Sequence, residues 1–244
     1  MTKRRAEWVL MALIFGVGLV WAVPPNPEAV RTGEFLKKLM QRPLSERRLT
    51  PEEAQRFQRE LKGFWDAATC AALILAWAED VASMESLKTL GNEARYPLTR
   101  DAASYALNIQ KLRVPNVDYF KSLCVLVRET TNCWESLFYA SCLYNDFGEE
   151  ALHEILEASK RCDDPVISWY FLSFLSSTKC DKIAAEAVEL FKDKDLVWDT
   201  TDSIFTIVSS LVPNRKIVMP GIAMERLRER LEDKRVSDCR CGKN

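Results

Sequence analysis

The stretch that decides the fold spans residues 162–180 and reads CDDPVISWYFLSFLSSTKC. Two cysteines frame an almost uninterrupted apolar run. If residues 165–177 form one helix, Cys162 and Cys180 lie at its opposite ends, roughly 20 Å apart. A disulfide needs Cα atoms within about 7 Å of each other, so we do not expect these two to pair. The cysteines then frame one helix of a larger pattern.

That larger pattern is a repeat that begins near residue 65. One apolar column recurs in the first helix of each expected helix pair at spacings of 33, 33, 33 and 34 residues: Ala72, Tyr105, Phe138, Phe171 and Phe205. A second column recurs in the second helices at spacings of 33, 32 and 33: Leu90, Leu123, Ile155 and Val188. Self-similarity at such a period is typical of stacked helical hairpins, although chance periodicity in a helical bundle is the alternative.

Helix signals also precede the repeats. Residues 26–27 and 50–51 each combine an N-cap side chain with proline at the first helical position, and Glu53 completes a capping box after the second. We expect the first helix to run to about Gln41, and the second to lead into a long helical pattern with Gly63 as its weak point. Nothing alternates at period two for long, and 8 glycines are few for an all-β chain. The sequence predicts an all-α fold, a right-handed α-solenoid of about five antiparallel helical hairpins with a 32–34-residue period.

One unit resembles a HEAT repeat, a member of the armadillo-type helical families. DDPVISWYFLSFLSS is followed by DKIAAEAVELF and KDKDLVW, as in repeats where an acidic turn and proline open the first helix and a second helix rich in small residues follows. The matching residues are Asp163, Asp164, Pro165, Val166, Ala184, Ala187 and Leu190. The resemblance covers residues 65–232. The chain also resembles tetratricopeptide repeats, on Trp134, Leu137, Ala151, Ile155 and Ala158, with Phe138 where that motif has a small residue. Both imply an α-solenoid.

The N-terminus has the pattern of a secretory signal. Residues 3–5 are Lys-Arg-Arg, an apolar run of about 16 residues follows, and two prolines end it. We expect cleavage after Ala22. The alternative is an uncleaved membrane tether through residues 8–23, although that run is shorter than the roughly 20 residues that span a bilayer. The predicted division is a signal at 1–22, N-terminal helices at 23–64, a repeat domain at 65–235 and a flexible cysteine-containing tail at 236–244.

Eight cysteines in an exported chain permit disulfides. Cys133 opens the first helix of one hairpin and Cys162 closes its second, so an antiparallel arrangement brings them together and allows a bridge. Cys180 lies in a predicted turn and is expected to be exposed. Three others have apolar helical neighbours and are expected to be buried free thiols: Cys70, Cys124 and Cys142. Cys239 and Cys241 fall in the polar tail, with too few neighbouring ligands for a zinc site.

Charge and motifs exclude several functions. Between residues 51 and 214 there are 26 acidic and 16 basic side chains, which argues against nucleic acid. The single histidine, His153, has no partner at metal-site spacing, and no phosphate loop or nucleophile elbow occurs. Asp199 and Asp202 beside Trp198 form the one candidate carboxylate pair, but capping of the next helix explains them better.

We therefore expect a non-enzymatic scaffold, secreted or periplasmic, that binds protein partners without a cofactor or metal. Trp134, Trp169 and Trp198, near the starts of successive first helices, are the candidate binding anchors on one concave surface, and stacked core positions are the equal alternative. The alternatives are an α-helical hydrolase with an acidic groove, and a membrane-anchored structural component of the cell envelope.

Overall fold

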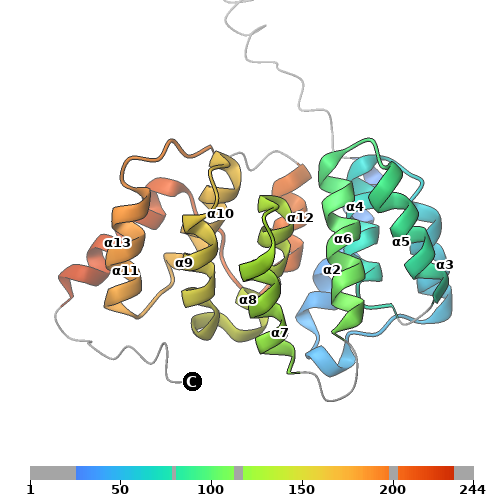
Figure 1. The fold of residues 1–244 in the computed structure, drawn as a ribbon, viewed down its shortest axis with the longest axis horizontal. Helices are drawn as coiled ribbons and strands as arrows, with labels where there is room; N and C mark the ends of the chain where they lie inside the picture. Colours follow the sequence, from blue (N-terminus) through green and yellow to red (C-terminus); the bar gives the residue numbers. More distant parts are fainter. Residues whose placement is uncertain (1–25, 79–80, 113–117, 198–202, 234–244) are drawn as a thin grey trace, which may run out of the picture.

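The computed structural model describes residues 26–78, 81–112, 118–197 and 203–233, and these contain α-helices, two short 3-10 helices and no strand (Figure 1). The all-α prediction is confirmed. The signal at 1–22 and the tail at 236–244 lie outside the described residues. The α-helices are α2 (Pro27–Gln41), α3 (Pro51–Glu60), α4 (Trp65–Leu75), α5 (Val81–Glu93), α6 (Pro97–Lys111), α7 (Tyr119–Glu129), α8 (Cys133–Phe147), α9 (Leu152–Lys160), α10 (Pro165–Leu175), α11 (Asp181–Phe191), α12 (Ser203–Leu211) and α13 (Pro220–Glu232). The 3-10 helices are Leu44–Glu46 and Gly148–Ala151.

The capping residues that the sequence predicted lie at the starts of helices in the structure. Asn26 accepts a hydrogen bond from the backbone N–H of Glu28, and α2 ends at Gln41 as predicted. Thr50 and Glu53 form the expected capping box at the start of α3. The long pattern after it breaks at the weak point, because α3 ends at Glu60 and α4 begins after the turn that contains Gly63.

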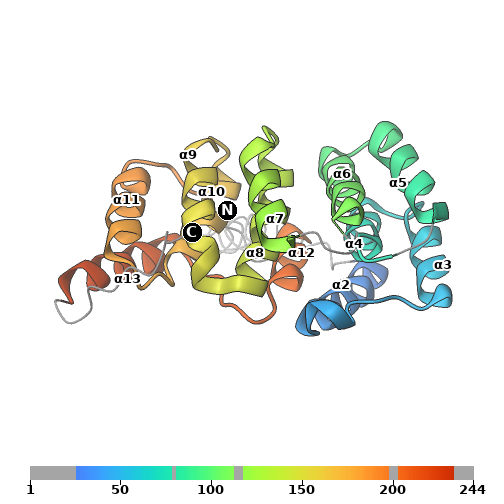
Figure 2. The ribbon, with the colours of Figure 1, turned by 60° about the horizontal axis from the view of Figure 1, so that its bottom comes forward.

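The helices pack in layers (Figures 1 and 2). α4, α6, α8 and α10 contact one another in chain order and form a central row. α5, α7, α9 and α11 lie along one side of this row, and α3 packs against α4 and α5 at one end. α2 and α12 cover the opposite side, where they contact each other, α4 and α8. α13 packs against α10 and α11 at the other end. Within the described residues, no helix combines the length and apolar content required to cross a bilayer.

The first apolar column occupies the centre of the row. Ala72, Tyr105, Phe138 and Phe171, on α4, α6, α8 and α10, are completely buried. Successive members of this column touch where α6 meets α8, because the rings of Tyr105 and Phe138 lie 5.8 Å apart between centroids. The second column is less uniform: Leu123 and Ile155 are buried and Leu90 and Val188 half-buried. Outer helices bury only their inward face, which explains the difference.

The end of the chain departs from the expected fifth hairpin. Phe205 lies on α12, which packs beneath the row on α2, α4 and α8, while α13 takes the place beside α10 and α11. The ring of Phe205 stacks on Trp169 with 6.2 Å between centroids. Because α12 is strongly apolar, packing between two layers removes more of its surface from water than contact with one neighbouring helix pair, and α2 supplies the second layer.

The loop between α2 and α3 is fixed to α8 by a buried ion pair. Arg47 is only 3% exposed and binds the Asp146 carboxylate through both terminal guanidinium nitrogens. The same side chain donates to the carbonyl oxygens of Arg42 and Met40, at 3.0 and 3.1 Å, and lies over the ring of Trp77. The two N-terminal helices therefore share one core with the rest of the described chain.

Candidate functional site

Two adjoining pockets form one groove at the α3–α5 end of the molecule, of about 430 and 460 Å³. Both include Leu61, Lys62, Leu90 and Ala94, so they lie side by side. We call this site the aromatic groove, and its two pockets the aromatic pocket and the α5 pocket. The aromatic pocket is completed by Gly63, Phe64, Trp65, Ala68, Arg95, Tyr96 and Thr99. The α5 pocket is completed by Gln58, Glu85, Ser86, Thr89 and Glu93.

Two helix starts position the aromatic residues. Phe64 is the N-cap residue of α4 and Tyr96 that of α6, and neither helix has a side-chain cap. Because α4 and α6 pack side by side, the two turns before them are brought together. A hydrogen bond of 2.9 Å between the hydroxyl groups of Thr69 and Thr99 holds the two helix starts, and the Thr99 hydroxyl also lies 3.3 Å from the Trp65 carbonyl oxygen.

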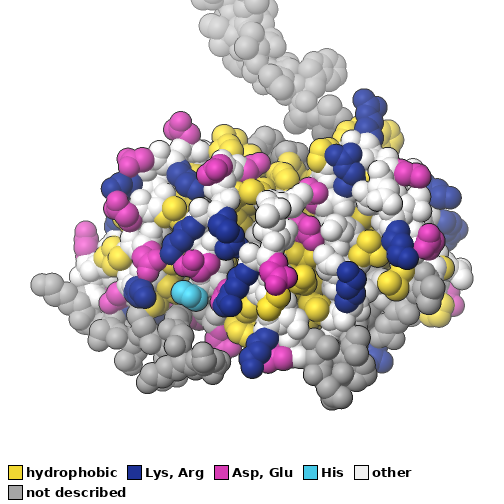
Figure 3. Space-filling model, in the orientation of Figure 1, with side chains coloured by type: hydrophobic (Ala, Val, Ile, Leu, Met, Phe, Trp, Pro, Cys, Tyr) yellow, Lys and Arg dark blue, Asp and Glu magenta, His cyan; other side chains and the backbone are white. Residues whose placement is uncertain are grey.

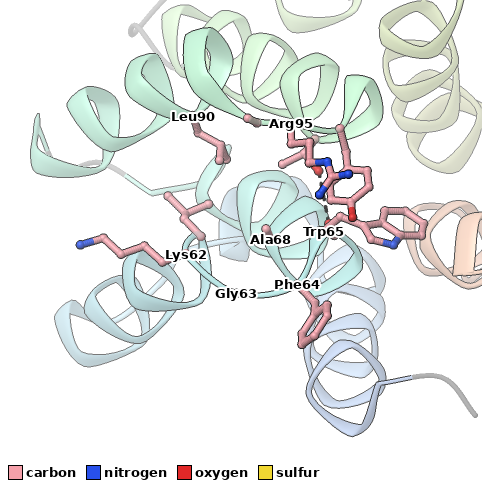
Figure 4. A pocket seen from close by; sticks show the side chains of 11 residues that line it. Lys62, Gly63, Phe64, Trp65, Ala68, Leu90 and Arg95 are labelled. Atoms are coloured by element: carbon pink, nitrogen blue, oxygen red, sulfur yellow. Dashed lines mark hydrogen bonds between the residues drawn. The ribbon is translucent and has the colours of Figure 1, made fainter.

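The aromatic side chains are unusually exposed. Phe64 is 73% and Tyr96 43% exposed, while Trp65 is half-buried. The rings of Trp65 and Tyr96 lie 6.0 Å apart, and the Arg95 guanidinium lies 5.7 Å from the centre of the Tyr96 ring. Figure 4 shows the exposed Phe64 ring directed away from the side chains of Trp65, Arg95 and Leu90, while Leu90 and Ala68 lie between the helices. Exposed aromatic residues around an apolar floor are typical of binding anchors.

The charges of the groove are separated along its length. Arg95 lines only the aromatic pocket, Glu85 and Glu93 line only the α5 pocket, and Lys62 lines both. Glu85 lies 3.4 Å from the ammonium group of Lys88 on the exposed side of α5. Figure 3 shows hydrophobic and basic side chains together at the upper right, over the ends of α4, α5 and α6. The groove thus offers apolar contact area with a basic end and an acidic end.

The structure describes two of the three tryptophans that were predicted as anchors, Trp134 and Trp169. Trp169 is buried, and its indole N–H donates to the carbonyl oxygen of Val218 at 2.8 Å, so it is a core residue. Trp134 is half-buried and packs against the core from the start of α8. Trp198 lies outside the described residues, as do Asp199 and Asp202. His153 is exposed on α9. Within the described ranges, no group of three or more His, Cys, Asp or Glu side chains is arranged to hold a metal ion.

Cys133 and Cys162 meet at the open end of the α8–α9 pair, as the antiparallel geometry predicts. Their side chains are within hydrogen-bonding distance, and both are free thiols in this structure. Burial, together with a hydrogen bond to Cys133 that favours the protonated thiol, raises the pKa of Cys162 to about 12. The two sulfur atoms line a small pocket of about 160 Å³ between α8 and α9. A bridge between them stays a prediction.

The other described cysteines divide into two groups. Cys70, Cys124 and Cys142 are buried and free, which confirms the prediction for them. The prediction that Cys180 is exposed was wrong: it is buried and disulfide-bonded. α13 covers the turn before it, because Arg230 donates to the carbonyl oxygen of Lys179 at 2.7 Å.

Phe64 and Tyr96 were not identified from the sequence. The available signal was their position, because an aromatic residue at an N-cap replaces the usual Ser, Thr, Asp or Asn. Comparison of the chain with protein-family models, curated proteins and solved structures finds no match. The function therefore has to be argued from the groove itself.

Proposed function

We propose that this chain is an exported, non-enzymatic helical-repeat scaffold that binds a protein partner through the aromatic groove. The observation that carries the proposal is the exposure of Phe64 and Tyr96, 73% and 43%, at the rim of an apolar floor. Leaving large aromatic surface in water is unfavourable, and its burial by a partner yields roughly 25 cal/mol per Å² before the costs of association.

The proposal includes a stack of HEAT-like or tetratricopeptide-like helix pairs. In its support, four helices of the central row bury equivalent residues near their centres: Ala72, Tyr105, Phe138 and Phe171. Solenoids of this kind commonly bind partners along an extended inner face. Here α2 and α12 cover one side of the row, so we place the binding site at its end, beside α3 and α5.

Export is proposed from the sequence of residues 1–22. A basic start and an apolar run before a small residue favour cleavage after Ala22, which makes the protein secreted or periplasmic. The mass of the protein recovered from its native cells separates this from a tether through residues 8–23, because cleavage removes 22 residues.

The test is quantitative co-purification from native cells after chemical crosslinking. Three forms are compared: the wild type, the double variant Phe64→Ser/Tyr96→Ser, and the control Val125→Ser, which alters an exposed apolar residue on α7. We expect a defined set of proteins to be recovered with the wild type and the control but to fall at least tenfold with the double variant. Equal recovery with all three forms would remove the groove as the binding site.

A further inference from the structure

The groove has a direction that is set by α5. Its wall is one stripe of that helix and the turn after it, formed by Glu85, Ser86, Thr89, Leu90, Glu93 and Ala94. From Glu85 to Ala94 the stripe extends about 14 Å at the rise of an α-helix. It leads from the acidic α5 pocket to the aromatic pocket, so a bound segment meets acidic side chains at one end and basic side chains at the other.

The charges nearest the junction of the two pockets are available for a partner. Within the described residues, Lys62, Glu93 and Arg95 form no ion pair with another side chain, although each lines the groove and is exposed. A cation–π contact orients the Arg95 guanidinium over the ring of Tyr96. Arg100 adds a further basic side chain nearby, because its guanidinium donates to the Ala94 carbonyl oxygen at 3.0 Å.

Resting on the proposed function, we infer that the partner segment is a peptide with asymmetric charge. It seats one aromatic or large aliphatic side chain in the aromatic pocket, places an acidic residue beside Arg95, and places a basic residue beside Glu85 and Glu93 in the α5 pocket. The apolar anchor supplies most of the affinity, since buried aromatic contacts dominate interfaces. The charges supply orientation and selectivity, because a segment laid the other way brings like charges together.

The volume of the site agrees with this assignment. The aromatic pocket of about 430 Å³ falls in the range that holds a compact ligand group, about 300–1,000 Å³. The α5 pocket of about 460 Å³ adjoins it, since four residues line both pockets. One anchor and a few flanking residues of an extended or helical segment therefore occupy the groove together.

A library of short random peptides displayed on phage tests the inference directly. The library is selected against the full chain and against the double variant Lys62→Glu/Arg95→Glu. The matched control is Lys216→Glu/Arg228→Glu, which changes the net charge equally at exposed residues away from the groove. We expect peptides enriched on the wild type to carry an apolar anchor with an acidic residue on one side and a basic residue on the other. The acidic preference should disappear on the groove variant and persist on the control.

Two outcomes overturn the inference, and they are distinguishable. Enriched peptides without charge asymmetry, whose binding is lost in Phe64→Ser/Tyr96→Ser, would refute the assignment of the partner but leave the groove as a binding site. If no enriched peptide depends on Phe64 and Tyr96, the proposed function and the inference both fail.

Discussion

The ion pair between Arg47 and Asp146 offers the sharpest test of how the N-terminal helices are held. Removal of the carboxylate in Asp146→Ala leaves the Arg47 guanidinium buried, with 4% of its side chain exposed, and without its counter-ion. Two charge-assisted hydrogen bonds are lost, and only those to the carbonyl oxygens of Arg42 and Met40 remain. Breaking a buried pair from one side costs about 3–5 kcal/mol, so we expect the free energy of unfolding to fall by that amount.

Urea unfolding followed by far-UV circular dichroism measures the effect, with two further variants. The charge-free double variant Arg47→Met/Asp146→Leu should lose less than Asp146→Ala alone, because no unpaired charge stays buried. Lys121→Ala breaks an exposed pair with Asp118, with the two side chains 77% and 54% exposed, and should cost less than about 1 kcal/mol. A loss below about 1 kcal/mol in Asp146→Ala would show that the pair does not hold the loop to α8.

Three other predictions each concern a single feature. A disulfide between Cys133 and Cys162 closes a loop of 30 residues and should raise the free energy of unfolding by about 3.5 kcal/mol. A reductant should then lower the urea midpoint of the wild type more than that of Cys133→Ser. Equal shifts of the two midpoints would contradict the bridge. Gly148→Ala should cost about 1–3 kcal/mol in urea unfolding, because Gly148 has a φ of 58°, a backbone conformation that residues with a Cβ rarely adopt. Gly221→Ala, with open space around it, should cost nothing, and equal losses would refute the strain argument. Burial raises the pKa of Cys70 to about 12 from 9.0, so the folded state keeps a proton that the unfolded chain releases, and stability present below pH 9 is lost as the pH rises toward 12. Thermal melts across this pH range should show a shallower fall of the melting temperature with pH for Cys70→Ala than for the wild type. An unchanged slope would contradict the assignment.

Local signals predicted the N-terminal helices well because their causes are local. A cap side chain, a proline and an acidic residue within four positions determine where α3 begins, whatever the rest of the chain does. The same holds for α10, where Asp164 accepts hydrogen bonds from the backbone N–H groups of Val166 and Ile167.

The position of α12 could not be predicted from the 32–34-residue repeat period of the sequence. Its apolar residues can be buried by a neighbouring repeat or by another layer, and the sequence pattern is the same in both cases. The choice depends on α2, which lies far away in the chain and packs against α12. A contact between two helices so distant in sequence is a tertiary property that a local repeat pattern does not encode.

The candidate site was missed for a related reason. Trp169 was a candidate because of its position near the start of a first helix, yet it finds a buried hydrogen-bond partner in Val218, which is far from it in sequence. Phe64 and Tyr96 become a joint feature only when α4 and α6 pack together, because 32 positions separate them. Composition and spacing give no measure of which aromatic residues stay exposed.

Site-specific photocrosslinking in native cells tests the central claim most directly. A photoreactive phenylalanine analogue is placed at Phe64 in one strain and at Val125, exposed on α7, in another. The account predicts that the probe at position 64 yields a discrete crosslinked protein and the probe at position 125 does not. The same adducts from both positions, or none from position 64, would contradict it.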